Sequence, residues 1–137
     1  MEEIKLENLP ELKGSAKQIE WANDIRKNVI QKINYYLNPD KKLSQDEINC
    51  REHDYAVECV QKLCTHPFNK DWDRQLCMQE EKVEEEFEIQ RDQLDDDPDC
   101  EKFDQLVHEM YDRMYYELAK GVIPARTDAG DWIQWLR

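Results

Sequence analysis

The stretch SAKQIEWANDIRKNVIQKINYY, residues 15–36, sets the fold class, because it combines a helix start with a long apolar stripe. Ser15 and Gln18 form a Ser-x-x-Gln capping box, in which each side chain bonds the backbone N–H of the other residue. Apolar side chains then recur every three or four residues: Ile19, Ala22, Ile25, Val29, Ile33 and Tyr36. This period predicts an amphipathic helix of roughly residues 16–37.

A second helix is predicted between this one and residue 66. Asn38-Pro39-Asp40 ends the first helix, and Ser44 with Glu47 supplies a second capping box. The second helix is expected to stop near Thr65, before Pro67. Its apolar face is expected to hold Ile48, Tyr55, Cys59 and Leu63.

Residues 69–121 predict an acidic helical hairpin. The first arm begins around residues 69–71 and turns one apolar face inward, made of Leu76, Val83, Phe87 and Leu94. Asp97 is expected to cap the second arm, with Pro98 as its first helical residue. The second arm carries Phe103, Leu106, Val107, Met110, Met114 and Leu118. It is expected to end at Lys120, with Gly121 as the glycine that follows the helix.

The ends of the chain complete the expected architecture. Residues 1–14 are expected to form an extended lead, since Pro10 blocks an early helix. Residues 127–137 predict a short C-terminal helix that docks through Trp132 and Trp135. The chain has 3 Gly, 5 Pro and no useful stretch of alternating apolar and polar residues. The prediction is a mostly α, compact, single helical domain over residues 1–137, with a long antiparallel helical hairpin.

Residues 80–99, EEKVEEEFEIQRDQLDDDPD, concentrate the negative charge of the chain. Eleven acidic residues stand against Lys82 and Arg91, whereas the whole 137-residue chain has a net charge of −13. A solvated helix face is the simplest explanation of such a run. However, like charges four residues apart destabilise a helix by a few tenths of a kcal/mol each, and a purely solubilising face would more often mix signs. A basic partner surface would offset that cost. The expected partner-binding residues are Glu81, Glu84, Glu85, Glu88, Asp92, Asp95 and Asp96.

The net charge also bears on other partners and on location. A chain at −13 repels phosphates, which argues against direct nucleic-acid binding and against binding to anionic membrane. The start, MEEIKLENLPEL, has no apolar signal-peptide core, and no segment is long and apolar enough to span a bilayer. We therefore expect a cytoplasmic protein. The oligomeric state is left open.

No motif predicts catalysis, a cofactor or a metal site. A zinc site could be composed from Cys50 with His53, and from Cys59, Cys64, His66 and Cys77, but the five cysteines include no CxxC pair. Buried or bystander thiols are the favoured interpretation. The acidic turn of residues 95–99 lacks the spacing and the glycine of an EF-hand calcium loop. The pairs Tyr35-Tyr36 and Tyr115-Tyr116 are expected to pack in the core or at an interface rather than stack on bases.

Residues 9–26, LPELKGSAKQIEWANDIR, resemble an N-terminal motif found in many short proteins of bacteriophages and bacterial mobile elements. This motif has the pattern L-P-x-L-x-G-S-x-K-Q-x-x-W-A-x-x-I-R, and it matches Leu9, Pro10, Leu12, Gly14, Ser15, Lys17, Gln18, Trp21, Ala22, Ile25 and Arg26. The C-terminal segment from Thr127 to Arg137 resembles the T-x-A-x-x-W-I-x-x-R motif often paired with it, with looser spacing and an extra Trp135. The resemblance implies a scaffold in which the N-terminal and C-terminal motifs pack together, each burying a tryptophan, around a variable helical insert. The acidic middle of the chain is unmatched.

A phage origin suggests a function by analogy. Small acidic phage proteins are often inhibitors of host defence, including anti-CRISPR proteins that imitate nucleic acid. We therefore expect an inhibitor, not an enzyme, that acts in the bacterial host cell and blocks DNA binding by an RNA-guided nuclease. The alternative is a structural or accessory phage protein that associates with itself or a virion partner through Trp132 and Trp135.

Overall fold

The computed structural model describes residues 3–65, 70–93 and 100–136, without the side chains of Lys70, Cys100, Glu101 and Trp135. In this part of the chain the fold is all-α, and the only β-type pairing is an isolated bridge between Lys13 and Asp128. The predicted fold class is confirmed. The elements in chain order are η1 (Leu6–Asn8), α1 (Ala16–Tyr36), α2 (Gln45–Ile48), α3 (Arg51–Cys64), α4 (Lys70–Asp92), α5 (Cys100–Val107), the π-helical turn η2 (His108–Asp112), α6 (Arg113–Ala125) and α7 (Ala129–Leu136).

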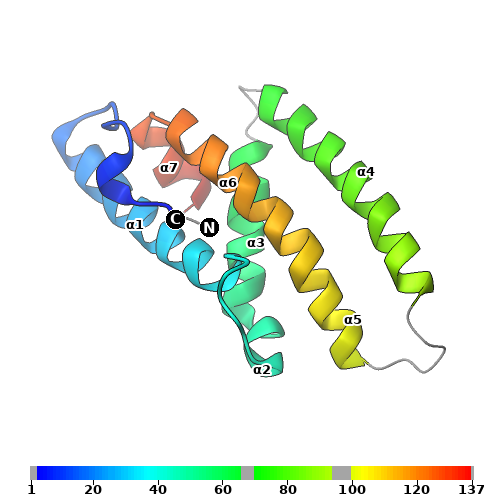
Figure 1. Cartoon of the computed structure of the whole chain (residues 1–137). Helices are drawn as coiled ribbons and strands as arrows, with labels where there is room; N and C mark the ends of the chain where they lie inside the picture. The colour runs from blue at the N-terminus through cyan, green and yellow to red at the C-terminus, as the bar shows by residue number, and fades with distance from the viewer. Residues whose placement is uncertain (1–2, 66–69, 94–99, 137) are drawn as a thin grey trace.

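Four helices enclose the hydrophobic core. Helix α1 packs against α7 and α3, and α3 also packs against α6 (Figure 1). Helices α5 and α6 join through η2 into one long column, and α4 runs antiparallel to this column on the outside of the molecule (Figure 1). This is the predicted helical hairpin. Its turn, including Leu94 and the predicted cap Asp97-Pro98, lies outside the described residues.

Both predicted capping boxes are present. The Ser15 hydroxyl accepts a hydrogen bond from the Gln18 backbone N–H, and the Gln18 side chain accepts one from the Ser15 N–H. Ser44 and Glu47 make the same reciprocal pair at the start of α2. Helix α1 therefore begins where the sequence places it, and its buried face includes three residues of the predicted stripe: Ala22, Val29 and Ile33.

The N-terminal and C-terminal motifs pack together, as predicted. The Lys13 backbone N–H donates to the Thr127 carbonyl (2.7 Å), and the Ala129 N–H donates to the Lys13 carbonyl (2.8 Å). Gly14 has φ +153°, and a Cβ there would lie 3.2 Å from the Ala129 Cβ, so a glycine suits this close crossing. Arg26 also donates to the Pro10 carbonyl (3.0 Å), which fixes the lead against α1.

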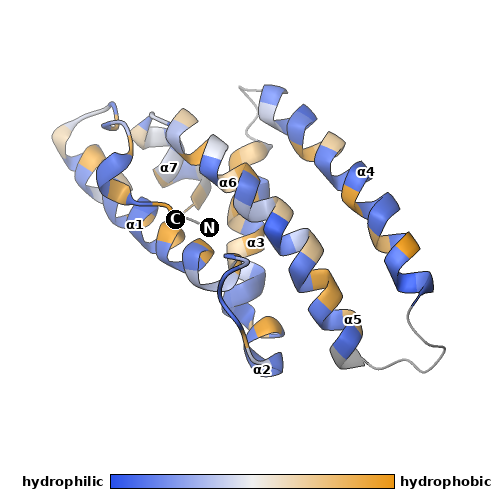
Figure 2. Ribbon diagram, in the orientation of Figure 1, coloured by the Kyte–Doolittle hydropathy of each residue, from blue (hydrophilic) through white to orange (hydrophobic). Residues whose placement is uncertain are grey.

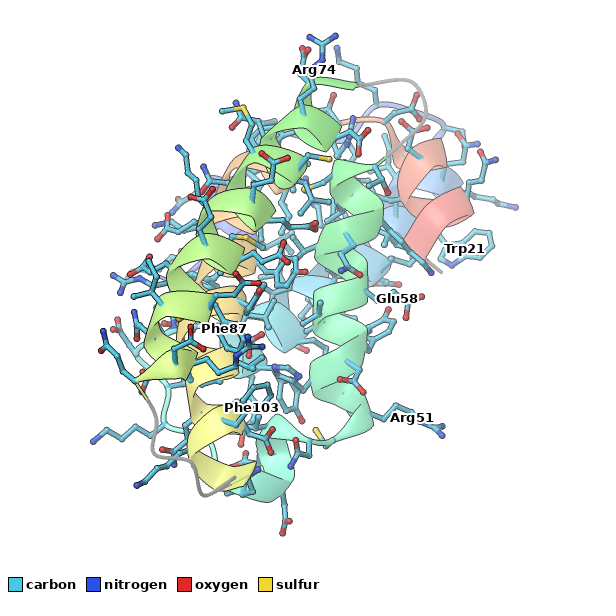
Figure 3. All side chains as sticks on the ribbon, turned by 90° about the vertical axis from the view of Figure 1, so that its right-hand side faces the viewer. Trp21, Arg51, Glu58, Arg74, Phe87 and Phe103 are labelled. Carbon is cyan, nitrogen blue, oxygen red and sulfur yellow. The ribbon has the colours of Figure 1, made fainter. Side chains whose placement is uncertain are left out.

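The tryptophans of the two motifs differ in burial. Trp132 is 1% exposed and donates its indole N–H to the Arg126 carbonyl (2.8 Å). Trp21 is 49% exposed and extends away from the body in Figure 3, so the expectation that it is buried is wrong. The next residue, Ala22, occupies the buried face of α1, and a step of about 100° carries Trp21 away from that face.

The segment predicted as one helix from Ser44 to Thr65 is broken in two. Cys50 has extended backbone angles (φ −82°, ψ 163°), which end α2 and allow α3 to restart at Arg51. The break removes Ile48 from the register of the later residues. The buried face of α3 also includes His53, which the predicted stripe did not contain.

The predicted helix end at Gly121 is also wrong, because α6 continues to Ala125 with Pro124 inside its last turn. Pro124 lacks only one backbone donor there, and the burial of Val122 and Ile123 compensates for that loss. The role of Gly121 is close packing. A Cβ at this position would lie 2.4 Å from Cη2 of Trp72, where α4 crosses α6.

We expect Gly121→Ala to lower the free energy of unfolding by up to about 2 kcal/mol. Alanine favours a helix over glycine by about 1 kcal/mol, but forcing Trp72 aside costs about 1–3 kcal/mol. Urea denaturation measures the net effect. The control is the Trp72→Leu background, in which the same change is expected to be neutral or stabilising. Equal destabilisation in both backgrounds would contradict the proposed contact.

Candidate functional site

The exposed face of α4 carries most of the predicted partner-binding residues. Glu81, Glu84, Glu85, Glu88 and Asp92 are all exposed, while Leu76 and Phe87 of the same helix are buried. At 100° per residue the five carboxylates occupy an arc of about 100° on the side away from the core. They extend over about 17 Å of helix, since each residue adds about 1.5 Å. We call these five residues the acidic face; the predicted Asp95 and Asp96 lie outside the described residues.

The negative charge of the acidic face is not offset by ion pairs with the described residues. Among residues 3–65, 70–93 and 100–136, no ion pair engages any of its five carboxylates. Arg91 is next to Asp92 in sequence, but its guanidinium carbon lies 6.0 Å from the centre of the Phe87 ring. A cation–π contact thus draws this arginine toward the buried side of the helix. The resulting field would attract a basic surface.

Two exposed apolar side chains flank the acidic face. Ile89 is 62% exposed and Met78 is 52% exposed. The aromatic residues of α4, Trp72 and Phe87, turn toward the body. Ile89 and Met78 are therefore the available apolar anchors on this side of the helix. Figure 2 shows that α4 is hydrophilic along most of its length, with isolated apolar positions.

An open groove of about 750 Å³ runs between α4 and the column formed by η2 and α6. Its lining is mixed, with several glutamines and glutamates beside a few apolar side chains. The lining residues are Trp72, Gln75, Gln79, Val83, Glu86, Gln90, Glu109, Met110, Arg113, Met114, Glu117 and Leu118. Three carboxylates and only one basic side chain make this groove acidic as well, so it is not an anion pocket.

Aromatic contacts hold the acidic helix to the molecule. The Phe87 ring lies 5.5 Å from that of Phe103 and 5.4 Å from that of Tyr111, both in edge-to-face geometry (Figure 3). Such pairs contribute about 0.5–1.5 kcal/mol beyond simple burial. These contacts fix the orientation of α4, which keeps its five carboxylates on one rigid face.

A buried polar cluster lies elsewhere in the fold, and no motif in the sequence connects its members. His53 Nε2 lies 2.5 Å from Asp112 Oδ2, and His108 Nδ1 lies 2.6 Å from the same oxygen. Burial lowers the pKa of His53, but the hydrogen bond and charge of Asp112, assisted by Asp54, outweigh it and raise the pKa above its usual value. One feature of the sequence could have indicated that His53 is buried: it lies at helical spacing from Ala56, Val60 and Leu63, which are on the buried face of α3.

Within the described residues, the cysteines of the possible zinc site are not gathered into a cluster of metal-ligand atoms. Cys59 and Cys64 are buried in the core, where burial raises the pKa of their thiols to about 11 and about 12. Such thiols stay protonated near neutral pH and are poor nucleophiles and ligands. Cys77 is exposed on α4, and His66 lies outside the described residues. The favoured interpretation of Cys59 and Cys64 as buried hydrophobes is confirmed.

Together these features define an all-α protein with a one-sided acidic helix and a buried His–Asp–His cluster. No known family model, curated protein or solved structure matches the chain. Within the described residues, no helix combines the length and apolar character needed to cross a bilayer. The surfaces and side chains of the chain itself are therefore the basis for a function.

Proposed function

We propose that this protein is a phage-encoded anti-defence inhibitor that binds the basic nucleic-acid groove of a host defence enzyme through its acidic face. The observation that carries the proposal is the set of five exposed carboxylates on one side of α4, none of them in an ion pair within the described residues. Uncompensated like charges are unfavourable on an isolated helix, and a cationic groove would remove that cost.

The spacing of the carboxylates suits a surface that normally holds nucleic acid. Along Glu81, Glu85, Glu88 and Asp92, steps of three or four residues place the carboxylates about 5 Å apart along the helix axis. Phosphates follow each other about every 3.4 Å along one strand of duplex DNA. The acidic face is thus sparser than a phosphate strand but of the same order, and Ile89 beside it adds an apolar contact that phosphates do not make.

An RNA-guided CRISPR nuclease is the target we favour, by analogy with acidic anti-CRISPR proteins. Such nucleases hold DNA in a Lys- and Arg-rich channel and read a short DNA motif with arginines. Glu81, Glu84, Glu85, Glu88 and Asp92 would occupy phosphate positions in that channel, so that DNA cannot enter. In this role the protein acts in the cytoplasm of the bacterial host, binds no nucleic acid itself and catalyses no reaction.

Reversal of three charges tests the proposal. We expect Glu85→Lys, Glu88→Lys and Asp92→Lys together to weaken inhibition of DNA binding by about 100-fold or more, because three attractive contacts become repulsive. The nuclease is first captured from the bacterial host by pull-down and then purified. DNA binding by the nuclease is measured against inhibitor concentration at low and at moderate salt, since exposed charge contacts are screened by salt.

The matched control carries the same change in net charge away from α4. Glu11→Lys, Glu20→Lys and Asp24→Lys alter exposed carboxylates in the lead and on α1, and we expect them to reduce inhibition by less than about 10-fold. Equal loss of inhibition in both triple variants would show that inhibition depends on the net charge of the protein and not on the position of the carboxylates. Full inhibition by the α4 variant would refute the proposal.

A different surface, on α1, supports the alternative function. In that alternative the protein is a structural or accessory phage protein that associates with itself or a virion partner. Trp132 is buried and unavailable for an interface, but Trp21 and Tyr35 are both exposed on α1. Their separation of fourteen residues places them within about 40° of each other on that helix. Association that is insensitive to salt, and that Trp21→Ala abolishes, would favour this alternative.

A further inference from the structure

We propose that His53, His108 and Asp112 form a binding site for a divalent transition metal of the zinc type, which joins α3 to the η2 turn. Three potential ligand atoms, two imidazole nitrogens and one carboxylate oxygen, lie within 4.8 Å of one another. Two imidazoles and a carboxylate are a set of ligands that zinc uses in proteins, with a fourth position left for water. This inference is independent of the proposed function of the acidic face.

The dimensions of the cluster suit such an ion. Bonds of about 2.0–2.1 Å in tetrahedral geometry place neighbouring ligand atoms about 3.3 Å apart. The two nitrogens lie 2.5 and 2.6 Å from Asp112 Oδ2, so the ligands have to separate by about 0.7 Å to admit the metal. Side-chain rotations alone can supply a displacement of this size.

The second nitrogen of His53 has the surroundings that a metal-bound histidine uses. His53 Nδ1 is buried without a hydrogen-bond partner, and it lies 3.6 Å from Asp54 Oδ1. If Nε2 binds a metal, Nδ1 carries the proton and points toward Asp54. Metal-bound histidines usually have such a carboxylate or carbonyl behind them.

The backbone holds the ligands in place. His108 and Asp112 are the two ends of the π-helical turn η2, and α3 brings His53 against them. Turns of this kind are rare and occur frequently at functional sites. The three side chains are only 10%, 11% and 3% exposed, so the site is sheltered from water.

The experiment measures zinc binding by the full-length protein. The protein is stripped with a chelator, dialysed and titrated with ZnCl₂ by calorimetry. We expect one zinc per chain and a higher Tm in its presence. Cobalt chloride provides a second probe: bound Co²⁺ is expected to show ligand-field bands without thiolate-to-cobalt charge transfer, because no cysteine belongs to the site.

Three variants locate the ion. We expect His108→Gln to lower zinc affinity by about 100-fold or more, since it removes a ligand. Asp54→Asn changes an exposed side chain, so it tests the site without a risk to folding, and we expect a loss of about 10- to 100-fold. Asp24→Asn, an equal charge change on α1, is expected to bind zinc like the wild type. The proposal is overturned if the wild type binds no zinc, if neither His108→Gln nor Asp54→Asn weakens binding, or if cobalt shows thiolate charge transfer.

Discussion

Trp132→Ala is expected to lower the free energy of unfolding by about 3–5 kcal/mol, the largest single-residue effect that the structure predicts. The indole is 1% exposed, and its removal leaves a cavity at the junction of α7 with α1 and α3. The substitution also removes the hydrogen bond from Trp132 Nε1 to the Arg126 carbonyl (2.8 Å), and a buried acceptor left without its donor adds to the cost. Urea denaturation followed by far-ultraviolet circular dichroism measures the change.

Trp21→Ala is the matched control, because it removes the same side chain from an exposed position on α1. Trp21 is 49% exposed, so we expect a loss of about 1 kcal/mol or less. The comparison separates burial from residue type. Similar losses in the two variants would show that Trp21 is covered in solution, by a partner chain or by an arrangement of α1 that differs from this structure.

Phe87→Ala is the second large effect, with an expected loss of about 3–5 kcal/mol. Phe87 is 7% exposed and contacts Phe103 and Tyr111 across the interface between α4 and the α5–α6 column. Without this ring the outer helix loses its main attachment at that end. We therefore also expect faster amide hydrogen exchange in α4 than in α1, because local opening of α4 then costs less free energy than global unfolding.

Ile89→Ala, two residues further along the same helix, is the control for this prediction. Its side chain is 62% exposed, so we expect a change in stability within about 0.5 kcal/mol and unchanged hydrogen exchange in α4. The proposed function adds a second expectation, that Ile89→Ala weakens partner binding while leaving the fold intact. If Phe87→Ala left both stability and exchange unaltered, the interface would not hold α4 in the way the structure describes.

The sequence predicted the helix starts that carry a capping box, but it missed the restart at Arg51 and placed the end of the second hairpin arm too early. The capping boxes at Ser15 and Ser44 depend only on residues three apart, and both are present. The predicted helix end at Gly121 was wrong. A glycine after a basic residue is typical of a helix end, but here the glycine allows the close crossing of α4 and α6. Whether Trp72 would lie against that position depends on how α4 packs on α6, which no local pattern contains.

The two candidate sites also differ in whether local sequence could predict them. The acidic face could be predicted because a single helix carries all of its members, and helical period alone places Glu81, Glu85 and Glu88 on one side. The His53–Asp112–His108 cluster was missed because its members come from two segments. Helical period places His53 on the buried face of α3, but only the packing of α3 against η2 brings it to Asp112, 59 residues further along the chain.

By itself the sequence determined the helical class, the two capped helix starts and the one-sided charge of α4. These properties follow from neighbours within one or two turns, where periodicity and capping act directly on the backbone. Only the tertiary structure decided that Trp132 is buried and Trp21 exposed, that Gly121 admits Trp72, and that two histidines share one carboxylate. Those outcomes depend on which helices meet and at what register, because burial and long-range contact are properties of the packed molecule rather than of any segment.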